Sequence, residues 1–150
     1  GAGYFENDDG GVPVLFLGST RPGGLGGIGT DIYVSQAVNG AFGPATLVAE
    51  LSSPQLDARP MPPFDGLELF LGSARPGTLG GLDLWAATRN TTAEPWSAPV
   101  NLGGVVNTPF GDQQPDIAFD RQTLFFASDR PGGFGGLDLY VTVRLQKHEE

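Results

Sequence analysis

The chain has 150 residues, and its 24 glycines and 13 prolines place it close to disordered sequences unless these residues recur with a fixed period. Acidic residues outnumber basic residues 17 to 8, and the net charge of −9 disfavours binding to the phosphate backbone of nucleic acids. The chain has no cysteine, no basic cluster and no apolar run long enough to cross a bilayer. We therefore expect no disulfide, no cysteine-rich zinc site and no membrane insertion.

The first predicted elements are two short strands near residues 4–6 and 14–19. The segment Asp8-Asp9-Gly10-Gly11 lies between them and is typical of a hairpin turn. A glycine-rich loop follows from Arg21, and the apolar segment that begins at Asp31 predicts a further strand.

The middle of the chain predicts four strands, at residues 59–64, 67–73, 83–88 and 96–102. A turn at Asp65-Gly66 separates the first two, and the loop 75–81 separates the second from the third. The last third of the chain repeats this order, but it ends near Arg144, before an obvious fourth strand.

These elements form an internal repeat, because the segments 15–35, 69–88 and 124–142 align with one another. Arg21, Arg75 and Arg130 mark equivalent points, at steps of 54 and 55 residues. The flanks repeat at an offset of 55 residues, pairing Pro44, Leu47, Asp57, Pro60 and Asp65 with Pro99, Leu102, Asp112, Pro115 and Asp120. Eleven of the 24 glycines lie in the three equivalent loops, so they indicate turns at a fixed place in a unit and not disorder.

Four short strands in a unit of about 50 residues are typical of a β-propeller blade. We therefore predict an all-β chain with a single β-propeller segment of three four-stranded blades, at residues 4–51, 57–103 and 112–144, followed by a tail at 145–150. Two sets of aromatic residues recur at equivalent strand positions, and we expect both sets in the core between blades: Phe16, Phe70 and Phe125, and Tyr33, Trp85 and Tyr140.

The repeated pattern is hydrophobic-Phe-x-x-Ser-x-Arg-Pro-Gly-Gly-x-Gly-Gly-x-Asp-[Leu/Ile]-Tyr-Val. It resembles the WD-repeat-like β-propeller repeat of the TolB type, most closely at residues 124–142. The second unit departs from the pattern at Thr78 and Trp85, and the first has two extra residues before Asp31 and no clear Asp-x-x-Pro element. The resemblance implies a bacterial, periplasmic or secreted propeller that binds proteins or cell-envelope components without catalysis.

Three blades cannot close a ring, because the first and last sheets would each expose a face. The resemblance implies about six blades. We therefore expect either a homodimer of two copies that forms a six-bladed ring, or further blades from a longer chain.

Each glycine-rich loop runs from an arginine to an aspartate, which predicts a clasp in which the aspartate accepts loop N–H groups and the arginine forks onto carbonyls or a carboxylate. The predicted clasp aspartates are Asp31, Asp83 and Asp138. The alternative is a ligand-binding loop face, formed by Arg21, Arg75, Arg130, Asp57 and Asp112.

Asp57 and Asp112 each begin an Asp-x-x-Pro segment, and a ring of such carboxylates is a weak candidate for binding Ca²⁺. Turn hydrogen bonds explain the same pattern, so we expect no required cofactor and no other metal. The single histidine, His148, lies beyond the last predicted strand, so a Ser-His-Asp triad is not expected.

These observations favour a non-enzymatic interaction or scaffold module that binds a protein or another ligand on its loop face. The alternative is a carbohydrate-binding or glycosidase-like propeller, suggested by the aromatic and acidic residues Trp85, Trp96, Asp57, Asp112 and Asp116.

Overall fold

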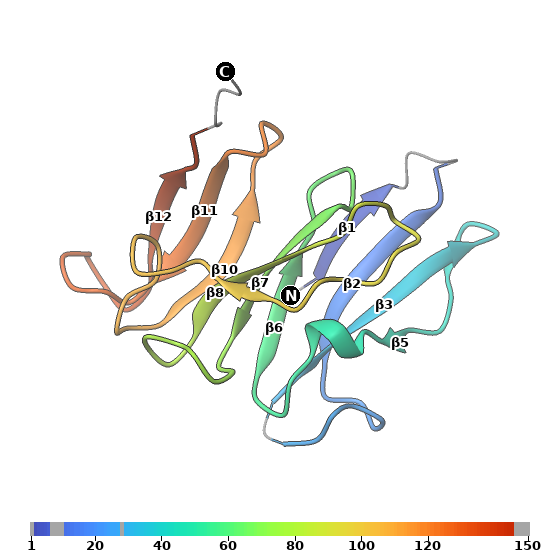
Figure 1. Ribbon diagram of the computed structural model, residues 1–150, viewed down its shortest axis with the longest axis horizontal. Helices are drawn as coiled ribbons and strands as arrows, with labels where there is room; N and C mark the ends of the chain where they lie inside the picture. The colour runs from blue at the N-terminus through green and yellow to red at the C-terminus, as the bar shows by residue number, and fades with distance from the viewer. Residues whose placement is uncertain (1, 7–10, 28, 146–150) are drawn as a thin grey trace.

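The computed structural model describes residues 2–6, 11–27 and 29–145. Within these residues the chain is all-β and forms three antiparallel sheets, which follow one another along the sequence (Figure 1). The only helix among them is the single 3-10 turn η1 (Ala49–Leu51), so no described helix is long and apolar enough to span a membrane. The predicted all-β class is confirmed.

The first sheet contains β1 (Ala2–Glu6), β2 (Pro13–Ser19), β3 (Asp31–Val38) and β4 (Ala41–Phe42) in that order. A short fifth strand, β5 (Thr46–Leu47), pairs with the other part of β3. β1 and β2 pair antiparallel, and residues 8–10 of the hairpin turn predicted between them lie outside the described residues.

The second sheet contains β6 (Asp57–Met61), β7 (Glu68–Ser73), β8 (Asp83–Thr88) and β9 (Val100–Asn101), again in sequence order. The fourth strand is much shorter than the predicted range 96–102. Pro95 and Pro99 have no N–H to donate to a ladder. The side chain of Trp96 is buried in the core, where it meets Phe16 edge to face at 5.8 Å.

The third sheet contains β10 (Asp112–Ile117), β11 (Thr123–Ser128) and β12 (Asp138–Val143), and it has three strands within the described residues. Its first strand carries the same irregularity as the first strand of the second sheet. The register shifts between Gln113 and Asp116, and Gln114 has a positive φ of 59°. Arg59, at the equivalent point of β6, has a φ of 55°. The repeat therefore extends to the backbone conformation of the bulge.

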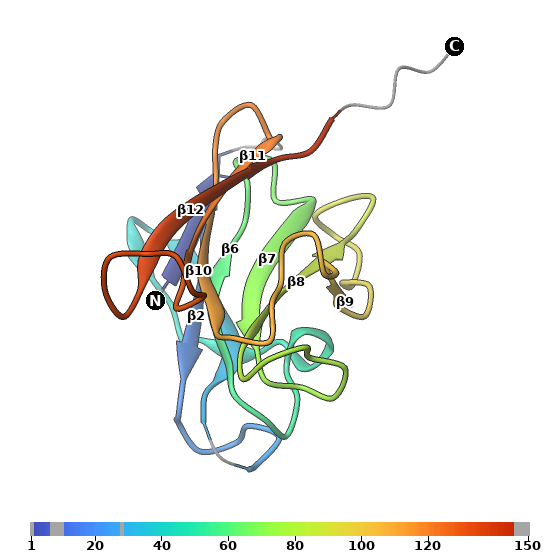
Figure 2. The same ribbon diagram turned by 90° about the vertical axis from the view of Figure 1, so that its left-hand side faces the viewer.

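The three sheets follow one another in chain order (Figures 1 and 2), and consecutive sheets pack against each other through apolar clusters. The cluster between the first and second sheets contains Val14, Phe16, Ile32, Val48, Leu51, Leu69, Leu71, Trp85, Ala87 and Trp96. The cluster between the second and third sheets contains Phe70, Leu84, Ile117, Leu124 and Phe126, with Met61, Ala86, Leu102, Val106 and Tyr140 packed against it. The first strands lie close to one another, since β6 contacts β1, β2 and β10.

One predicted core position is wrong. Phe16 and Phe70 are buried, at 2% and 3% exposure, but the equivalent Phe125 is 47% exposed. Phe16 packs on the second sheet and Phe70 on the third, whereas no described sheet covers the face that carries Phe125. In the other predicted set, Tyr33 and Trp85 are buried and Tyr140 is half-buried.

Candidate functional site

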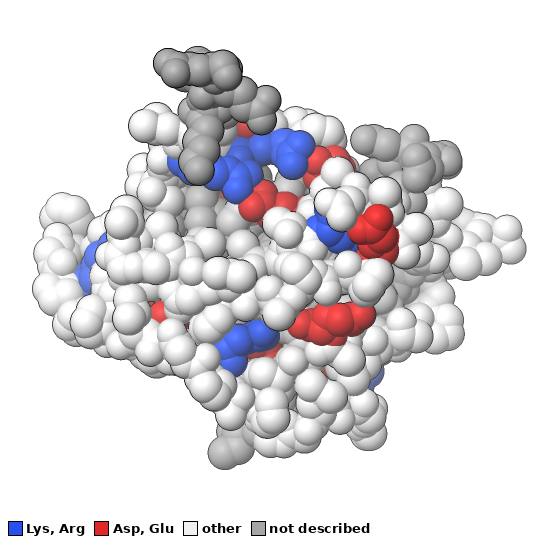
Figure 3. All heavy atoms as spheres, in the orientation of Figure 1, with Lys and Arg blue, Asp and Glu red and all other residues white. Residues whose placement is uncertain are grey.

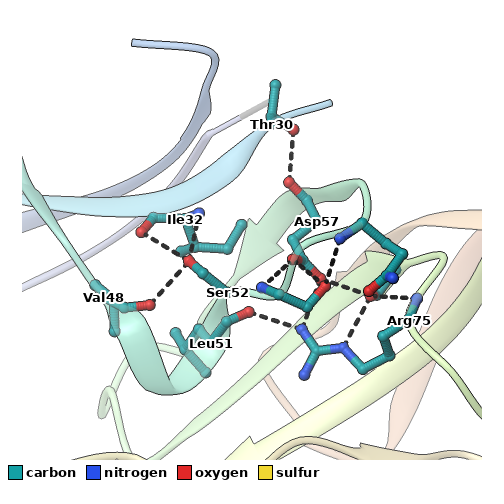
Figure 4. Close-up of polar contacts among 10 residues, drawn as sticks. Thr30, Ile32, Val48, Leu51, Ser52, Asp57 and Arg75 are labelled. Carbon is teal, nitrogen blue, oxygen red and sulfur yellow. Dashed lines mark hydrogen bonds and ion pairs between the residues drawn. The ribbon is translucent and has the colours of Figure 1, made fainter. Parts of the chain in front are cut away.

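The side chain of Asp57 forms the centre of a buried polar cluster at the start of β6 (Figure 4). Its Oδ1 accepts hydrogen bonds from Ser73 Oγ at 2.5 Å and Arg75 Nη2 at 2.6 Å. Its Oδ2 accepts from the backbone N–H of Ser53 at 2.6 Å and from Ser53 Oγ at 2.7 Å. The carboxylate has no exposed surface, and this ring of donors provides the compensation that a buried charge requires.

Arg75 connects this carboxylate to two other parts of the chain. Its Nη2 also donates to the carbonyl of Leu51 at 2.8 Å, and its Nε donates to Ser73 Oγ at 2.8 Å. The guanidinium carbon lies 5.4 Å from the ring centre of Trp85, in a cation–π contact. One arginine therefore joins β6, the end of β7 and the segment that precedes the second sheet.

The third unit contains the same cluster. Asp112 Oδ1 accepts from Arg130 Nη2 at 2.7 Å, and its Oδ2 accepts from the N–H and Oγ1 of Thr108 at 2.6 and 2.9 Å. Arg130 also donates to the carbonyl of Val106 at 2.6 Å and to Ser128 Oγ at 3.0 Å. Each of these residues lies 55 positions after its counterpart in the second unit. We call this repeated cluster the carboxylate–arginine lock.

The lock changes the acidity of Asp112. Burial disfavours its charged form and is the largest single influence on its pKa, but hydrogen bonds from Ser128, Arg130 and Thr108 together outweigh it and lower the pKa below 3.8. A carboxyl group with a lower pKa in the folded state stabilises the fold above its unfolded pKa and loses this contribution as the pH falls.

We therefore expect Asp112→Asn to destabilise the protein more at pH 7 than at pH 3. The difference in free energy of unfolding between wild type and variant should narrow as the pH falls below 3.8, because there the unfolded wild-type chain binds a proton at this carboxyl that the folded chain binds only at lower pH. Urea unfolding at a series of pH values measures this. A difference that stays constant from pH 7 to pH 3 would show that the folded state does not lower the pKa of Asp112.

The first unit has only part of the lock. Arg21 Nε donates to Ser19 Oγ at 3.0 Å, and its guanidinium lies 4.8 Å from the ring centre of Tyr33, but the side chain is exposed. Gly3 pairs with Phe16 as Met61 pairs with Phe70. β1 is described from Ala2, which lies opposite Leu17, so the strand position opposite Ser19 is not among the described residues.

The loop aspartates stabilise the glycine-rich loops by accepting hydrogen bonds from backbone N–H groups of the loops. Asp83 accepts from the N–H groups of Leu79 at 2.7 Å and Gly80 at 3.2 Å. Asp138 binds its loop in the same way, through Phe134 and Gly135 at 2.9 and 3.3 Å. These carboxylates are thus acceptors for backbone groups of the loop.

In the second and third units the aspartate of the predicted clasp accepts loop N–H groups and the arginine forks onto a carbonyl and a carboxylate, but this carboxylate is not the one of its own loop. Arg75 and Arg130 form their ion pairs with Asp57 and Asp112 instead. The register explains this, because Asp57 and Asp83 lie opposite Ser73 on its two sides in the sheet. The loop N–H groups occupy Asp83, and the arginine side chain turns to the other carboxylate.

Asp31 is the least satisfied of the loop aspartates. It accepts from the N–H of Leu25 at 3.2 Å, but its Oδ1 is buried without a hydrogen-bond partner among the described residues. Burial raises the pKa of Asp31, and the nearby charge of Asp57 adds to this effect, although the Leu25 hydrogen bond opposes it. The loop of Asp31 is two residues longer than the other two loops, and Asp31 accepts one hydrogen bond from a loop N–H group where Asp83 and Asp138 each accept two.

Two loop glycines allow close contact with the following unit. A Cβ atom at Gly27 would collide with the carbonyl oxygen of Pro54, and one at Gly80 would collide with that of Phe110. Gly135, equivalent to Gly80, has open space around it, since no linker to a further sheet is present among the described residues. The loops therefore rest on the linker that leads into the next sheet, and only glycine permits this distance.

The exposed part of the loop face differs from the predicted one. Asp57, Asp112, Arg75 and Arg130 are used inside the two locks, while Arg21 remains exposed. Apolar side chains extend from the tips of the loops, with exposed fractions of 45% at Leu25, 51% at Leu79 and 105% at Phe134. Charged side chains are sparse on the face shown in Figure 3, where acidic and basic groups lie next to one another.

The oxygens of Asp57 and Asp112, the weak calcium candidates, already accept hydrogen bonds from neighbouring side chains and backbone groups. No group of three or more potential ligands for a metal ion occurs among the residues that the structure describes. Trp85 and Trp96, which suggested a carbohydrate site, are buried at 7% and 6% exposure.

A cavity of about 230 Å³ lies beside the junction of the first and second sheets. Its apolar wall contains Phe16 and Trp96, and its polar wall contains Gln36, Glu50 and Arg89. Burial lowers the pKa of Arg89, whose guanidinium lies 4.1 Å from the ring centre of Trp96. The volume of the cavity lies below the range of about 300–1,000 Å³ that is usual for small-molecule sites.

Sequence reasoning missed Ser53 and Thr108, which donate to the lock carboxylates, and the carbonyls of Leu51 and Val106, which accept from the lock arginines. A signal for the first pair was present, because a hydroxyl residue stands four positions before each lock aspartate. The carbonyls left no such signal, since any residue supplies one.

No family model matches the chain, and no curated protein matches it. Among solved structures, it is similar to a protein of unknown function from Dyadobacter fermentans DSM 18053, with 19% sequence identity and a TM-score of 0.44. The match covers 95% of this chain and 38% of the other, so the chain spans less than two fifths of that protein's length.

Proposed function

We propose that the chain is a segment of a β-propeller, with each sheet as one blade, and that it acts as a non-enzymatic interaction or scaffold module. The junction between consecutive sheets carries this proposal. It occurs twice, with apolar residues at equivalent positions and a carboxylate–arginine lock at each crossing. Repeating units that bury their faces only against their neighbours are the basis of propellers and other repeat folds.

The positions of the first strands support a fan of blades around a common axis. β6 contacts both β1 and β10, while the short strand β9 lies at the opposite edge of its sheet. The resemblance of the repeat to the TolB type points the same way. An extracytoplasmic location, periplasmic or secreted, belongs to this proposal because it depends on that resemblance.

The proposed contact surface is the loop face, at Arg21 and the loop tips Leu25, Leu79 and Phe134. The locks and the loop aspartates fix the backbone on which these exposed groups stand. A rigid surface loses less conformational entropy on binding, which favours a specific protein partner. We infer a protein ligand, since exposed apolar side chains beside an arginine are typical of protein interfaces.

A crystal structure tests the blade arrangement, with β1, β6 and β10 expected around a common axis. Sheets stacked face to face with all strands aligned, as in a sandwich, would contradict it.

The cavity lined by Phe16, Trp96 and Arg89 favours a carbohydrate-binding or glycosidase-like propeller as the second candidate. A glycan array combined with a turnover assay on oligosaccharides separates the two functions. We expect no turnover. Glycan binding that Arg89→Ala abolishes would support a lectin, and hydrolysis would replace our proposal with a glycosidase. The lining residue Thr92 provides the control, as Thr92→Ser keeps the hydroxyl group.

A further inference from the structure

The third sheet has an apolar face that no described part of the chain covers. Phe125, Leu139, Val141 and Val143 are exposed by 47%, 85%, 57% and 56%. They occupy alternate positions on β11 and β12, and Phe125 lies directly opposite Val141 in the sheet. Side chains at alternate positions of paired strands point to one side, so these four form a single surface. We call it the open face.

The same positions are covered in the other two sheets. Leu84 corresponds to Leu139 and is 0% exposed, as is Ile32 in the first sheet. Phe70 and Phe16 correspond to Phe125 and are also buried. The side chains that cover them always come from the following sheet. They are Leu69, Leu71 and Trp85 at the first junction, and Leu124, Phe126 and Tyr140 at the second.

The first sheet carries an equivalent set of side chains, and no sheet precedes it among the described residues. Repeat alignment matches Leu15, Leu17 and Tyr33 to Leu69, Leu71 and Trp85. Phe16 points into the first junction, so its neighbours Leu15 and Leu17 point to the other side of β2, where they are half-buried. The two ends of the three-sheet stack thus carry the two halves of one further junction.

We propose that the open face of one copy docks onto the face of a second copy that carries the half-buried Leu15 and Leu17, above the buried Tyr33. This inference rests on the proposed function, because it extends the blade-to-blade packing to a second molecule. The two internal junctions support a second copy as the partner. Each joins a face equivalent to the open face with a face equivalent to the one that carries Leu15 and Leu17. Two copies joined by two such head-to-tail contacts close a ring of six sheets and leave neither face exposed.

Sedimentation velocity over a wide range of protein concentrations measures the assembly. We expect a mass of twice 15.7 kDa for the wild type. The double variant Leu139→Glu/Val141→Glu should remain monomeric at concentrations at least 100-fold higher, because it places two charges in the contact. Val105→Glu is the control, since Val105 is 93% exposed and lies away from the open face, and it should keep the double mass. A monomeric wild type, or an unchanged mass for the double variant, would overturn the proposal.

Cysteine cross-linking provides a second measurement if the charged variant does not fold. The chain has no cysteine, so Leu17→Cys and Leu139→Cys are clean probes. Their equivalents Phe126 and Leu84 share the second cluster. We expect a covalent dimer when the two single variants are mixed and oxidised, and none from either variant alone, because the contact joins unlike faces. Equal cross-linking in all three samples would overturn the head-to-tail arrangement.

Different results would contradict the docking of two copies and the propeller arrangement of the sheets. A monomer whose crystal structure shows the three sheets fanned around one axis would remove the docking and leave the propeller segment intact. A face-to-face arrangement of sheets would remove both.

Discussion

The variant Arg75→Ala is expected to lower the free energy of unfolding by about 3–5 kcal/mol, because it leaves a buried carboxylate without its cation. The side chain of Asp57 has no exposed surface, and Arg75 donates to it at 2.6 Å. The variant also removes the hydrogen bond to the carbonyl of Leu51, which connects the second sheet to the preceding segment. Urea unfolding at pH 7 measures the loss.

Arg21→Ala is the matched control for this lock. Arg21 occupies the equivalent loop position but is exposed and has no ion pair among the described residues. Its main contact is the cation–π pair with Tyr33, and such exposed pairs contribute about 0.5–1 kcal/mol. Similar losses for the two variants would show that the ion pair does not stabilise the second unit.

The second large effect is expected for Phe70→Ala, with a loss of about 3–5 kcal/mol in the free energy of unfolding. Phe70 is 3% exposed and packs between the second and third sheets. Removing its ring leaves a cavity in this junction, which a rigid pair of sheets fills only in part.

Phe125→Ala is the control, since Phe125 occupies the equivalent position and is 47% exposed. We expect a loss of about 1 kcal/mol or less from this variant when unfolding is measured on dilute protein. At concentrations that allow self-association, the same variant should weaken the dimer. Equal losses for Phe70→Ala and Phe125→Ala in dilute solution would contradict the packing described above.

The second sheet illustrates how far local sequence information reaches. The strand predicted at residues 83–88 coincides with β8, and the one predicted at 67–73 differs from β7 by one residue. Both lie between turn segments of glycine, proline and aspartate, and these residues act through local backbone geometry. The fourth strand was predicted too long, because the burial of Trp96 between two sheets is a tertiary contact.

The candidate site shows the same division. Repetition at 55 residues identified Asp57, Arg75, Asp112 and Arg130 as a set, but not how they pair. Arg75 stands eight residues before Asp83 and 18 after Asp57, and sequence distance favours the wrong partner. The strand register decides the pairing, since it places both carboxylates beside Ser73 and gives the loop N–H groups to Asp83.

The sequence by itself determined the repeat, the all-β class, the three glycine-rich loops and the residues that recur in them, because turns and strand alternation are local properties of the chain. Only the tertiary structure decided which carboxylate each arginine binds and which of three equivalent phenylalanines is buried. Phe16, Phe70 and Phe125 are alike in sequence, but burial depends on a neighbouring sheet, and no described sheet covers the face of the third sheet that carries Phe125.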